Sequence, residues 1–266
     1  MRLDPAAELA GYRLVAHENL DSTNAEALRM AFEHRCANDP VWIVAVRQTA
    51  GRGRRGNAWV SPAGNLHATL LLEDPASLPS DCPQLSFVAA LAAHDAVVRC
   101  ARALRDKLAI KWPNDLLCAD AKIGGILIEG YRLHSPLVVA VGIGINCAHH
   151  PADSSFPASD LAAQGEPVAP GDLFFALSGA MLQRLGQWAG GAGFGAIRSD
   201  WLDRAAGVGG ELRVRLPDRE LRGRYEALDE DGRLLLRLAD GSLQTIAAGE
   251  IFPVPGRQAG RSFLDL

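Results

Sequence analysis

The sequence predicts an α+β protein in which a large domain with a mixed or antiparallel sheet and covering helices is followed by a small β-barrel. Three observations predict this fold. Apolar runs of strand length recur between residues 41 and 145, amphipathic runs of helix length lie between and after them, and after Gly207 short strands alternate with turn residues. The predicted domain boundary separates residues 1–206 from residues 207–266.

Five runs in the larger domain have apolar residues on both alternating faces, which is typical of strands covered on both sides. These runs are residues 41–46, 66–72, 108–112, 122–129 and 137–145. The connections between the last three are about ten residues or shorter, and such connections favour antiparallel neighbours.

Four helices are predicted in the same domain. The segment Thr23-Asn24-Ala25-Glu26 has the form of a capping box and predicts a helix over residues 23 to about 36. Its apolar face is predicted to consist of Ala27, Leu28, Ala31 and Phe32. The other helices are expected over residues 84–105, 174–188 and 197–205.

The C-terminal segment is predicted to form a barrel of about 60 residues, which is near the lower size limit for independent stability. We therefore expect it to pack on the larger domain. Turn sequences such as Asp240-Gly241 separate its strands. The predicted strands are residues 211–216, 221–228, 233–238, 243–247 and 251–254.

The 266 residues are 48% hydrophobic and 22% charged, which is ordinary for a globular protein. A formal charge of −4 and a pI near 6.0 argue against a general nucleic-acid binder, whose surface would be strongly basic. No apolar run approaches the roughly 20 residues that cross a bilayer, and residues 1–5 lack the apolar segment of a signal peptide. The expected location is the cytoplasm, without membrane or nucleic-acid partners.

The cysteines are odd in number and lack a C-x-x-C pair, so we expect buried thiols rather than disulfides or a zinc site. They are Cys36, Cys82, Cys100, Cys118 and Cys147. The pair His149-His150 has no cysteine at ligand spacing and is interpreted as a loop feature. No metal ligands are predicted.

The segment Gly51-Arg52-Gly53-Arg54-Arg55-Gly56 concentrates three arginines and three glycines. Guanidinium groups stay charged and bind phosphate through several donors, while glycines let backbone amides approach an anion closely. The segment joins two predicted strands, so it is not a Walker loop, and the connection is far longer than the usual four to six residues or so. A plain solvated turn is the alternative interpretation.

Polar residues also follow three predicted strands. The segment Lys111-Trp112-Pro113-Asn114-Asp115 presents an amide and a carboxylate after a proline, although such residues often only stabilise a turn. Lys122 begins an apolar strand and needs an anionic partner, and Gly124-Gly125 leaves backbone bare for a flat ligand. The segment Gly142-Ile143-Gly144-Ile145-Asn146 ends in a further amide. Together these features indicate a site.

Five of these motifs occur in the order and spacing of the biotin protein ligases, which the chain resembles. The motifs are Ser22-Thr23-Asn24 and residues 48–56, 111–116, 122–127 and 142–146. The resemblance covers residues 18–150 and implies the catalytic fold shared by biotin ligases and class II aminoacyl-tRNA synthetases. The last module, with Gly249-Glu250-Ile251, resembles the SH3-like C-terminal domain of the family. Because only about twenty residues precede Ser22, we expect the DNA-binding domain of the repressor members to be absent.

The resemblance implies a reaction in two steps. Biotin and ATP, with Mg²⁺, give biotinyl-5′-adenylate and pyrophosphate, and a lysine of an acceptor protein then attacks the adenylate. The implied acceptor is the biotin carboxyl carrier domain of acetyl-CoA carboxylase or of a related biotin-dependent enzyme. Some family members pair through a sheet edge, so a homodimer is possible, and no feature of this sequence decides between monomer and dimer.

The resemblance also assigns residues. Arg54 and Lys122 are the expected catalytic residues, because two anions react only when cations neutralise their repulsion. Asn57-Ala58 departs from the longer basic run of many members and is expected to weaken retention of the adenylate. The residues expected to bind biotin or the nucleotide are Ser22, Thr23, Asn24, Gln48, Gly51, Arg52, Gly53, Arg54, Trp59, Asn114, Asp115, Lys122, Gly125, Ile126 and Asn146. Within this set, Ser22, Thr23 and Gln48 bond the biotin ring, Gly51 and Arg52 line the site, Gly125 and Ile126 line the biotin pocket, Trp59 stacks near adenine, and Asn114, Asp115 and Asn146 face the nucleotide or its Mg²⁺.

Two other interpretations of the sequence are open. A lipoate or octanoate ligase or transferase shares the fold, but the arginine-rich loop is of the biotin type. A biotin-sensing regulator or an RNA-binding module without catalysis fits poorly with the acidic pI. Pyrophosphate exchange into ATP with biotin, with lipoate or with no acid would separate the three.

Overall fold

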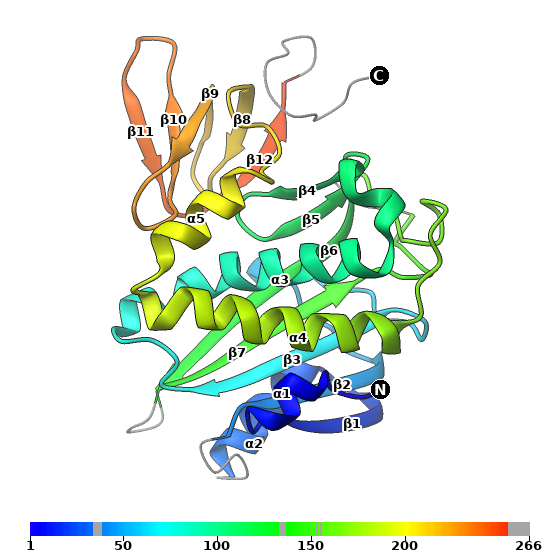
Figure 1. Ribbon diagram of the computed structural model, residues 1–266. Coiled ribbons are helices and arrows are strands. Elements are labelled where there is room, and N and C mark those ends of the chain that lie inside the picture. Colours follow the sequence, from blue (N-terminus) through cyan, green and yellow to red (C-terminus); the bar gives the residue numbers. More distant parts are fainter. Residues whose placement is uncertain (34–38, 133–136, 153, 155, 255–266) are drawn as a thin grey trace.

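The computed structural model describes residues 1–33, 39–132, 137–152, 154 and 156–254 (Figure 1). Cys36, the end predicted for the first helix and the last twelve residues of the predicted C-terminal domain lie outside the described residues. Within the described residues, no helix is both long and apolar enough to span a membrane.

A seven-stranded mixed sheet forms the centre of the larger domain, in the order β1-β2-β3-β7-β6-β5-β4. Strands β1 and β2 are parallel, and every other neighbouring pair is antiparallel. The predicted mixed sheet and the antiparallel pairing of β6 with β7 are confirmed. The strands are β1 (Arg13–Leu20), β2 (Val41–Gln48), β3 (Leu66–Glu73), β4 (Leu108–Lys111), β5 (Asp115–Cys118), β6 (Ala121–Arg132) and β7 (Leu137–Ile145).

The sequence interpretation missed β1 and β5. Strand β1 lies at the sheet edge and is only partly buried, so it lacks the apolar run of a central strand. Strand β5 has four residues and follows the proline turn directly. It lies between β4 and β6, so the prediction that these two strands are neighbours was wrong.

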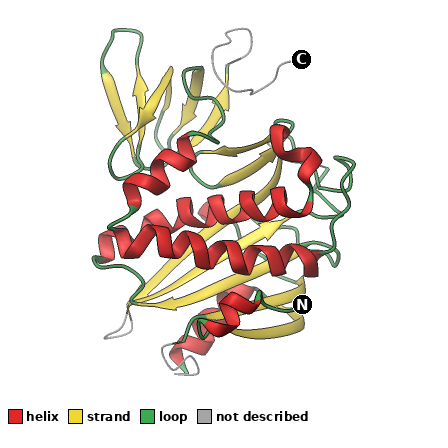
Figure 2. Cartoon of the chain, in the orientation of Figure 1, coloured by secondary structure: helices red, strands yellow, loops and turns green. Residues whose placement is uncertain are grey.

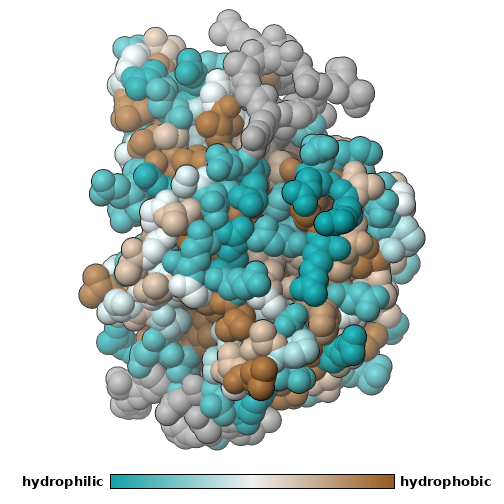
Figure 3. Space-filling view, viewed as in Figure 1, coloured by the Kyte–Doolittle hydropathy of each residue, from teal (hydrophilic) through white to brown (hydrophobic). Residues whose placement is uncertain are grey.

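Helices cover both faces of the sheet (Figures 1 and 2). On one face α3 and α4 lie side by side over the main core, and their outer surface mixes hydrophilic and hydrophobic residues (Figure 3). On the other face α2 packs on a smaller cluster that includes Ile43, Leu71 and Ala140. The α-helices are α1 (Pro5–Leu9), α2 (Thr23–Phe32), α3 (Leu85–Cys100), α4 (Pro170–Trp188) and α5 (Phe194–Leu202). Short 3₁₀ turns are η1 (Arg54–Gly56), η2 (Pro79–Gln84), η3 (Arg102–Lys107) and η4 (Ala189–Gly191).

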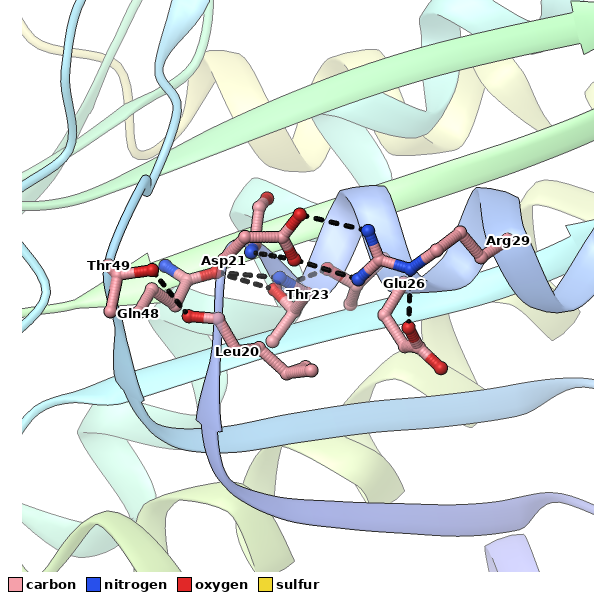
Figure 4. Close-up of polar contacts among 9 residues, drawn as sticks. Leu20, Asp21, Thr23, Glu26, Arg29, Gln48 and Thr49 are labelled. Atoms are coloured by element: carbon pink, nitrogen blue, oxygen red, sulfur yellow. Dashed lines mark hydrogen bonds and ion pairs between the residues drawn. The ribbon is translucent and has the colours of Figure 1, made fainter.

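The predicted capping box was wrong. The N-cap of α2 is Ser22, and Thr23 is the first helical residue, with its hydroxyl bonded to Gln48 instead of the helix end. Glu26 pairs with Arg29, which also binds Asp21 through two hydrogen bonds (Figure 4). These bonds from Arg29 hold the pKa of Asp21 at about 2.

Two further details of the helix predictions were also wrong. Phe32, predicted for the apolar face of α2, is 58% exposed at the helix end. The helix predicted over residues 84–105 ends at Cys100, where Ala101 leaves the helical conformation and η3 follows.

All five predicted C-terminal strands are present and form an antiparallel sheet in the order β11-β10-β9-β8-β12. As expected, the module packs on the larger domain: Trp112 Nε1 donates to the carbonyl of Gly232 at 3.1 Å, and Arg198 donates to that of Leu228 at 3.0 Å. The strands are β8 (Glu211–Arg215), β9 (Glu220–Leu228), β10 (Leu234–Arg237), β11 (Leu243–Ile246) and β12 (Glu250–Pro253).

Candidate active site

A cavity of about 510 Å³ opens on the sheet face that carries α2. Successive side chains of a strand point to opposite faces, so Val138 and Ala140 lie under α2 and Gly142 and Gly144 follow them on the same face. Gly142 makes room for Asn24 at the start of α2, and Gly144 makes room for the ring of Trp59 beyond it. The floor of the cavity is therefore bare backbone.

The structure brings the predicted site residues together around this cavity, with the exception of Gly51. They come from the start of α2 and the residue before it, the end of β2, the basic loop, the turn before β5 and its first residue, strand β6, and the residue that follows β7. The predicted residues that line the cavity are Ser22, Thr23, Asn24, Gln48, Arg52, Gly53, Arg54, Trp59, Asn114, Asp115, Lys122, Gly125, Ile126 and Asn146.

Gly51 shapes the basic loop from outside the cavity. Its carbonyl accepts a hydrogen bond from the Trp59 amide at 2.9 Å, and a Cβ at this position would collide with the carbonyl oxygen of Trp59 and lie 2.5 Å from Ser61 Oγ. Only glycine fits between these two stretches of the loop.

Changing Gly51 to alanine is expected to reduce ATP–pyrophosphate exchange by about tenfold or more. The added Cβ would meet a backbone oxygen, so the loop backbone itself must shift. The midpoint of thermal unfolding should change little, since the residue lies outside the core. Gly53→Ala is the matched comparison, because its added Cβ would lie 3.4 Å from the nearest atom, and it should retain more activity. Equal losses in the two variants would contradict this role of Gly51.

One end of the cavity carries a network of neutral hydrogen-bonding groups. Gln48 Oε1 accepts from the amide and the hydroxyl of Thr23 at 2.8 and 3.0 Å, and Gln48 Nε2 donates to Ser61 Oγ at 2.8 Å. Thr69 Oγ1 lies 2.8 Å from Thr23 Oγ1 and 2.6 Å from Asn24 Oδ1. These bonds fix donors and acceptors in place before any ligand arrives.

Arg52 is held by a carboxylate at this same end. Its Nη2 lies 3.0 Å from Glu129 Oε2, and Asn24 Nδ2 donates to the same oxygen at 2.8 Å. The Arg52 side chain is 43% exposed. Its charge is therefore shared between Glu129 and the solvent.

Arg54 lies deeper and has a neutral partner. Its Nη1 donates to Asn114 Oδ1 at 3.1 Å, and Asn114 Nδ2 donates to the carbonyl of Ile126 at 2.6 Å. Burial lowers the pKa of Arg54, and the adjacent Arg55 lowers it further, although a guanidinium stays charged at any physiological pH. Because Asn114 is the only hydrogen-bond partner of Arg54 among the described residues, other N–H groups of this guanidinium can bind an anion.

The side chain of Ile126 belongs to the main core, on the opposite face of the sheet from Gly125. Ile126 therefore contributes backbone atoms to the cavity and not an apolar wall.

Asp115 lies between two lysines at the opposite end of the cavity. Its Oδ1 is 2.6 Å from Lys122 Nζ, and its Oδ2 is 3.0 Å from Lys111 Nζ. Burial opposes the charged carboxylate, but the two ammonium groups outweigh it and keep the pKa of Asp115 below its ordinary value. One carboxylate thus holds two cations in a cavity that a third cation, Arg54, also lines.

Trp59 covers the glycine floor. Its ring lies against Gly125 and Gly144, where a Cβ on Gly144 would be 2.6 Å from the indole nitrogen, and Lys122 Nζ is 5.5 Å from the ring centre. The sequence interpretation expected this ring near adenine. That expectation stays a prediction, and the structure places the ring beside Gly125, one of the residues expected to line the biotin pocket.

Sequence reasoning missed several cavity residues. Lys111 was part of a quoted motif but received no role, and Glu250 was quoted only as a mark of the C-terminal module. The ring of Phe156 lies 4.1 Å from Lys111 Nζ, and no periodic pattern marks this loop residue in the sequence. The residues that received no role include His67, Lys111, Phe156, Glu250 and Phe252.

The described cysteines and histidines form no metal site. No group of three or more metal-ligating side chains occurs among the residues that the structure describes. Cys82, Cys118 and Cys147 are buried free thiols, as predicted, and burial raises the pKa of Cys147 to about 12. His150 Nδ1 lies 2.6 Å from Asp160 in a loop, so its partner is a carboxylate.

Cations from separate segments that line one cavity, beside fixed hydrogen-bonding groups, are typical of an enzyme site that binds anionic substrates. The chain is 41% identical to a biotin–[acetyl-CoA-carboxylase] ligase of Paracoccus denitrificans, over 87% of this chain and 97% of that protein. It is 32% identical to the bifunctional ligase/repressor BirA of Bacillus subtilis, over 91% of this chain and 74% of that protein. The chain therefore belongs to the biotin protein ligase family and is a ligase.

The two parts of the chain match separately described families. Residues 17–146 match the biotin/lipoate A/B protein ligase family, and residues 209–252 match the biotin protein ligase C-terminal domain. A biotin protein ligase from Aquifex aeolicus, solved in complex with biotin and ATP, has the same fold. It superposes with a TM-score of 0.71 at 23% identity, over 90% of this chain and 97% of that chain.

Proposed function

We propose that the chain activates biotin with MgATP and transfers it to a lysine of a biotin carboxyl carrier domain. In the first step a biotin carboxylate oxygen attacks the α-phosphorus, the bond to the bridging oxygen of the β-phosphate breaks, and pyrophosphate leaves. In the second step the acceptor amine attacks the adenylate carbonyl, AMP leaves, and the amine loses a proton. The observation that carries the proposal is the convergence of Arg54, Lys111 and Lys122 on one cavity.

The cations address the main barrier of the first step, the repulsion between a carboxylate and a triphosphate. Lys122 can leave Asp115 and bind a substrate anion, because Lys111 still pairs with Asp115. Arg54 presents unused donors from the loop side. We assign these two residues to the reacting carboxylate and the α-phosphate, with Arg52 and Gly53 closing the loop over them.

The hydrogen-bonding network of Thr23 and Gln48 suits the ureido ring of biotin, which has both donors and an acceptor. Thr23 and Gln48 are already bonded to each other in a fixed geometry, and Ser22 and Asn24 flank them at the start of α2. Gly125 and the backbone of Ile126 form the adjoining floor, and Trp59 covers it. We therefore propose that Trp59 contacts the vitamin, and that the base lies elsewhere.

The nucleotide belongs at the lysine end. Asn114, Asp115 and Asn146 line it, and Phe156 offers an aromatic face near Lys111. Both oxygens of Asp115 are bonded to lysines. We therefore expect Mg²⁺ to be bound by the phosphates of ATP and not by this carboxylate. The metal then enters as part of the substrate.

We propose residues 1–206 as the catalytic domain and residues 207–266 as the C-terminal domain. The second contributes to the same cavity through Glu250 and Phe252. The negative charge of Glu250 acts on Arg54, since it raises the pKa of that guanidinium against the effect of burial. The C-terminal module thus borders the reacting end of the site.

Pyrophosphate exchange into ATP tests the proposed reaction. Exchange that requires biotin is expected, with none above background for lipoate or without an acid. A purified biotin carboxyl carrier domain should then gain the mass of one biotinyl group, and a carrier in which the acceptor lysine is changed to arginine should gain none. Lipoate-dependent exchange would favour the lipoate ligase alternative. If neither biotin nor lipoate supported exchange, the proposal would be overturned.

A further inference from the structure

Two buried polar atoms beside the glycine floor have no hydrogen-bond partner within the described part of the chain. They are Nδ1 of His67 and Nε1 of Trp59. His67 is 1% exposed and lines the cavity from β3. A buried donor or acceptor left unpaired costs about 1–3 kcal/mol, so each of these atoms calls for a partner.

The tautomer of His67 follows from its other nitrogen. His67 Nε2 lies 3.1 Å from the carbonyl oxygen of Pro62, which only accepts hydrogen bonds, so Nε2 carries the proton. Burial lowers the pKa of His67 and favours the neutral ring. Nδ1 is then an acceptor, whereas the indole Nε1 of Trp59 is always a donor.

The orientation of the indole places its donor end on the side of the strand that carries His67. Residues Gly125, Gly144 and His67 are consecutive partners across strands β6, β7 and β3, on one face of the sheet. The Cζ3 atom of Trp59 lies near Gly125, and its Nε1 atom lies near Gly144. The ring thus runs along this row, with its N–H end on the side of β3.

We propose that His67 is a positioning residue that accepts a hydrogen bond from the Trp59 indole once the basic loop shifts from its position in this structure, in which neither atom has a partner among the described residues. His67 would then hold the loop at two points, Pro62 through Nε2 and Trp59 through Nδ1. The inference deepens the proposed function, on which its catalytic consequence rests. Its structural part concerns the ligand-free chain alone and stands without any substrate.

Two substitutions separate the nitrogens of His67. Asparagine puts an acceptor close to the position of Nδ1, and glutamine puts a donor close to that of Nε2. In a ¹H–¹⁵N spectrum of the ligand-free chain, Trp59→Phe identifies the indole signal of Trp59 among the five tryptophans. We expect that signal to stay near its original shift in His67→Asn, and to move upfield with about five- to tenfold faster water exchange in His67→Gln. His94→Leu, which removes a buried histidine from α3, is the control and should leave the signal unchanged.

Catalysis gives the second measurement. The KM for biotin in pyrophosphate exchange should rise about five- to tenfold in His67→Gln and less in His67→Asn, and His67→Gln should add nothing to Trp59→Phe in the double variant. Identical Trp59 signals in the asparagine and glutamine variants would overturn the hydrogen bond. The Trp59 signal could move in His67→Gln although the unchanged chain shows no biotin-dependent exchange. That result would support the hydrogen bond and refute only the proposed function.

Discussion

Replacing Lys122 by alanine is expected to reduce biotin-dependent ATP–pyrophosphate exchange by about 100- to 1000-fold. The substitution removes the ammonium group that lies 2.6 Å from Asp115 and faces the cavity. Asp115 keeps Lys111, so the buried carboxylate stays paired, and the transition state alone loses a cation. The fall should therefore be seen in kcat for exchange, with a smaller change in the KM for biotin.

Lys107→Ala is the matched control, because Lys107 is exposed in η3, away from the cavity. It should exchange pyrophosphate as the unchanged chain does. Thermal unfolding of both variants tests whether Lys122→Ala still folds, and a free adenylate supplied to it should still be consumed by the carrier domain. Exchange within about threefold of normal in a folded Lys122→Ala chain would remove Lys122 from the reaction.

The site gathers its cations before any substrate arrives, which is costly in a cavity of low dielectric. Two carboxylates reduce this cost, because Asp115 pairs with Lys111 and Lys122 while Glu129 pairs with Arg52. Arg54 has only the oxygen of Asn114 as its bonded partner in the described structure. Substrate anions can then replace these partners at the cations, so the protein needs little reorganisation during the reaction.

The sequence was sufficient to predict the central strands of the larger sheet and the antiparallel pairing of β6 with β7. Continuous apolar runs mark strands that are covered on both sides, and a short connection leaves little choice but an antiparallel partner. The edge strand β1 and the four-residue β5 carry neither signal. Strand β5 also explains why the neighbour predicted for β4 was wrong, since it inserts between β4 and β6.

The site was predictable as a set of motifs and unpredictable in its contacts. Thr23 looked like a helix cap, but its hydroxyl is bonded to Gln48 across 25 positions of sequence. Ile126 lines the cavity as expected, but strand alternation turns its side chain into the core, which the motif did not indicate. Phe156 and Glu250 reach the cavity through a loop and through the C-terminal module, and long-range packing of this kind leaves no local pattern in the chain.

Replacing Arg54 by glycine is expected to leave adenylate synthesis partly active and to let the adenylate escape about 10- to 100-fold faster. The reason is that Arg54 ties the basic loop to Asn114, whose amide is bonded in turn to the carbonyl of Ile126 on the floor. A charged hydrogen bond of this kind contributes about 1.5–3 kcal/mol, and each 1.4 kcal/mol corresponds to roughly tenfold in escape rate. Release of labelled adenylate from the preformed complex measures the effect directly.

Arg55→Gly distinguishes this role from a general loss of positive charge. Arg55 is exposed in the same loop and has a φ of 57°, a conformation that glycine adopts without strain, so the variant keeps the loop fold and removes one arginine. It should retain the adenylate far better than Arg54→Gly. Escape as slow in Arg54→Gly as in the unchanged chain would show that the loop is held without this arginine, and equally fast escape in both variants would assign retention to net charge. Faster escape in Arg54→Gly alone assigns retention to contacts that Arg54 makes and its exposed neighbour lacks, among them the bond to Asn114.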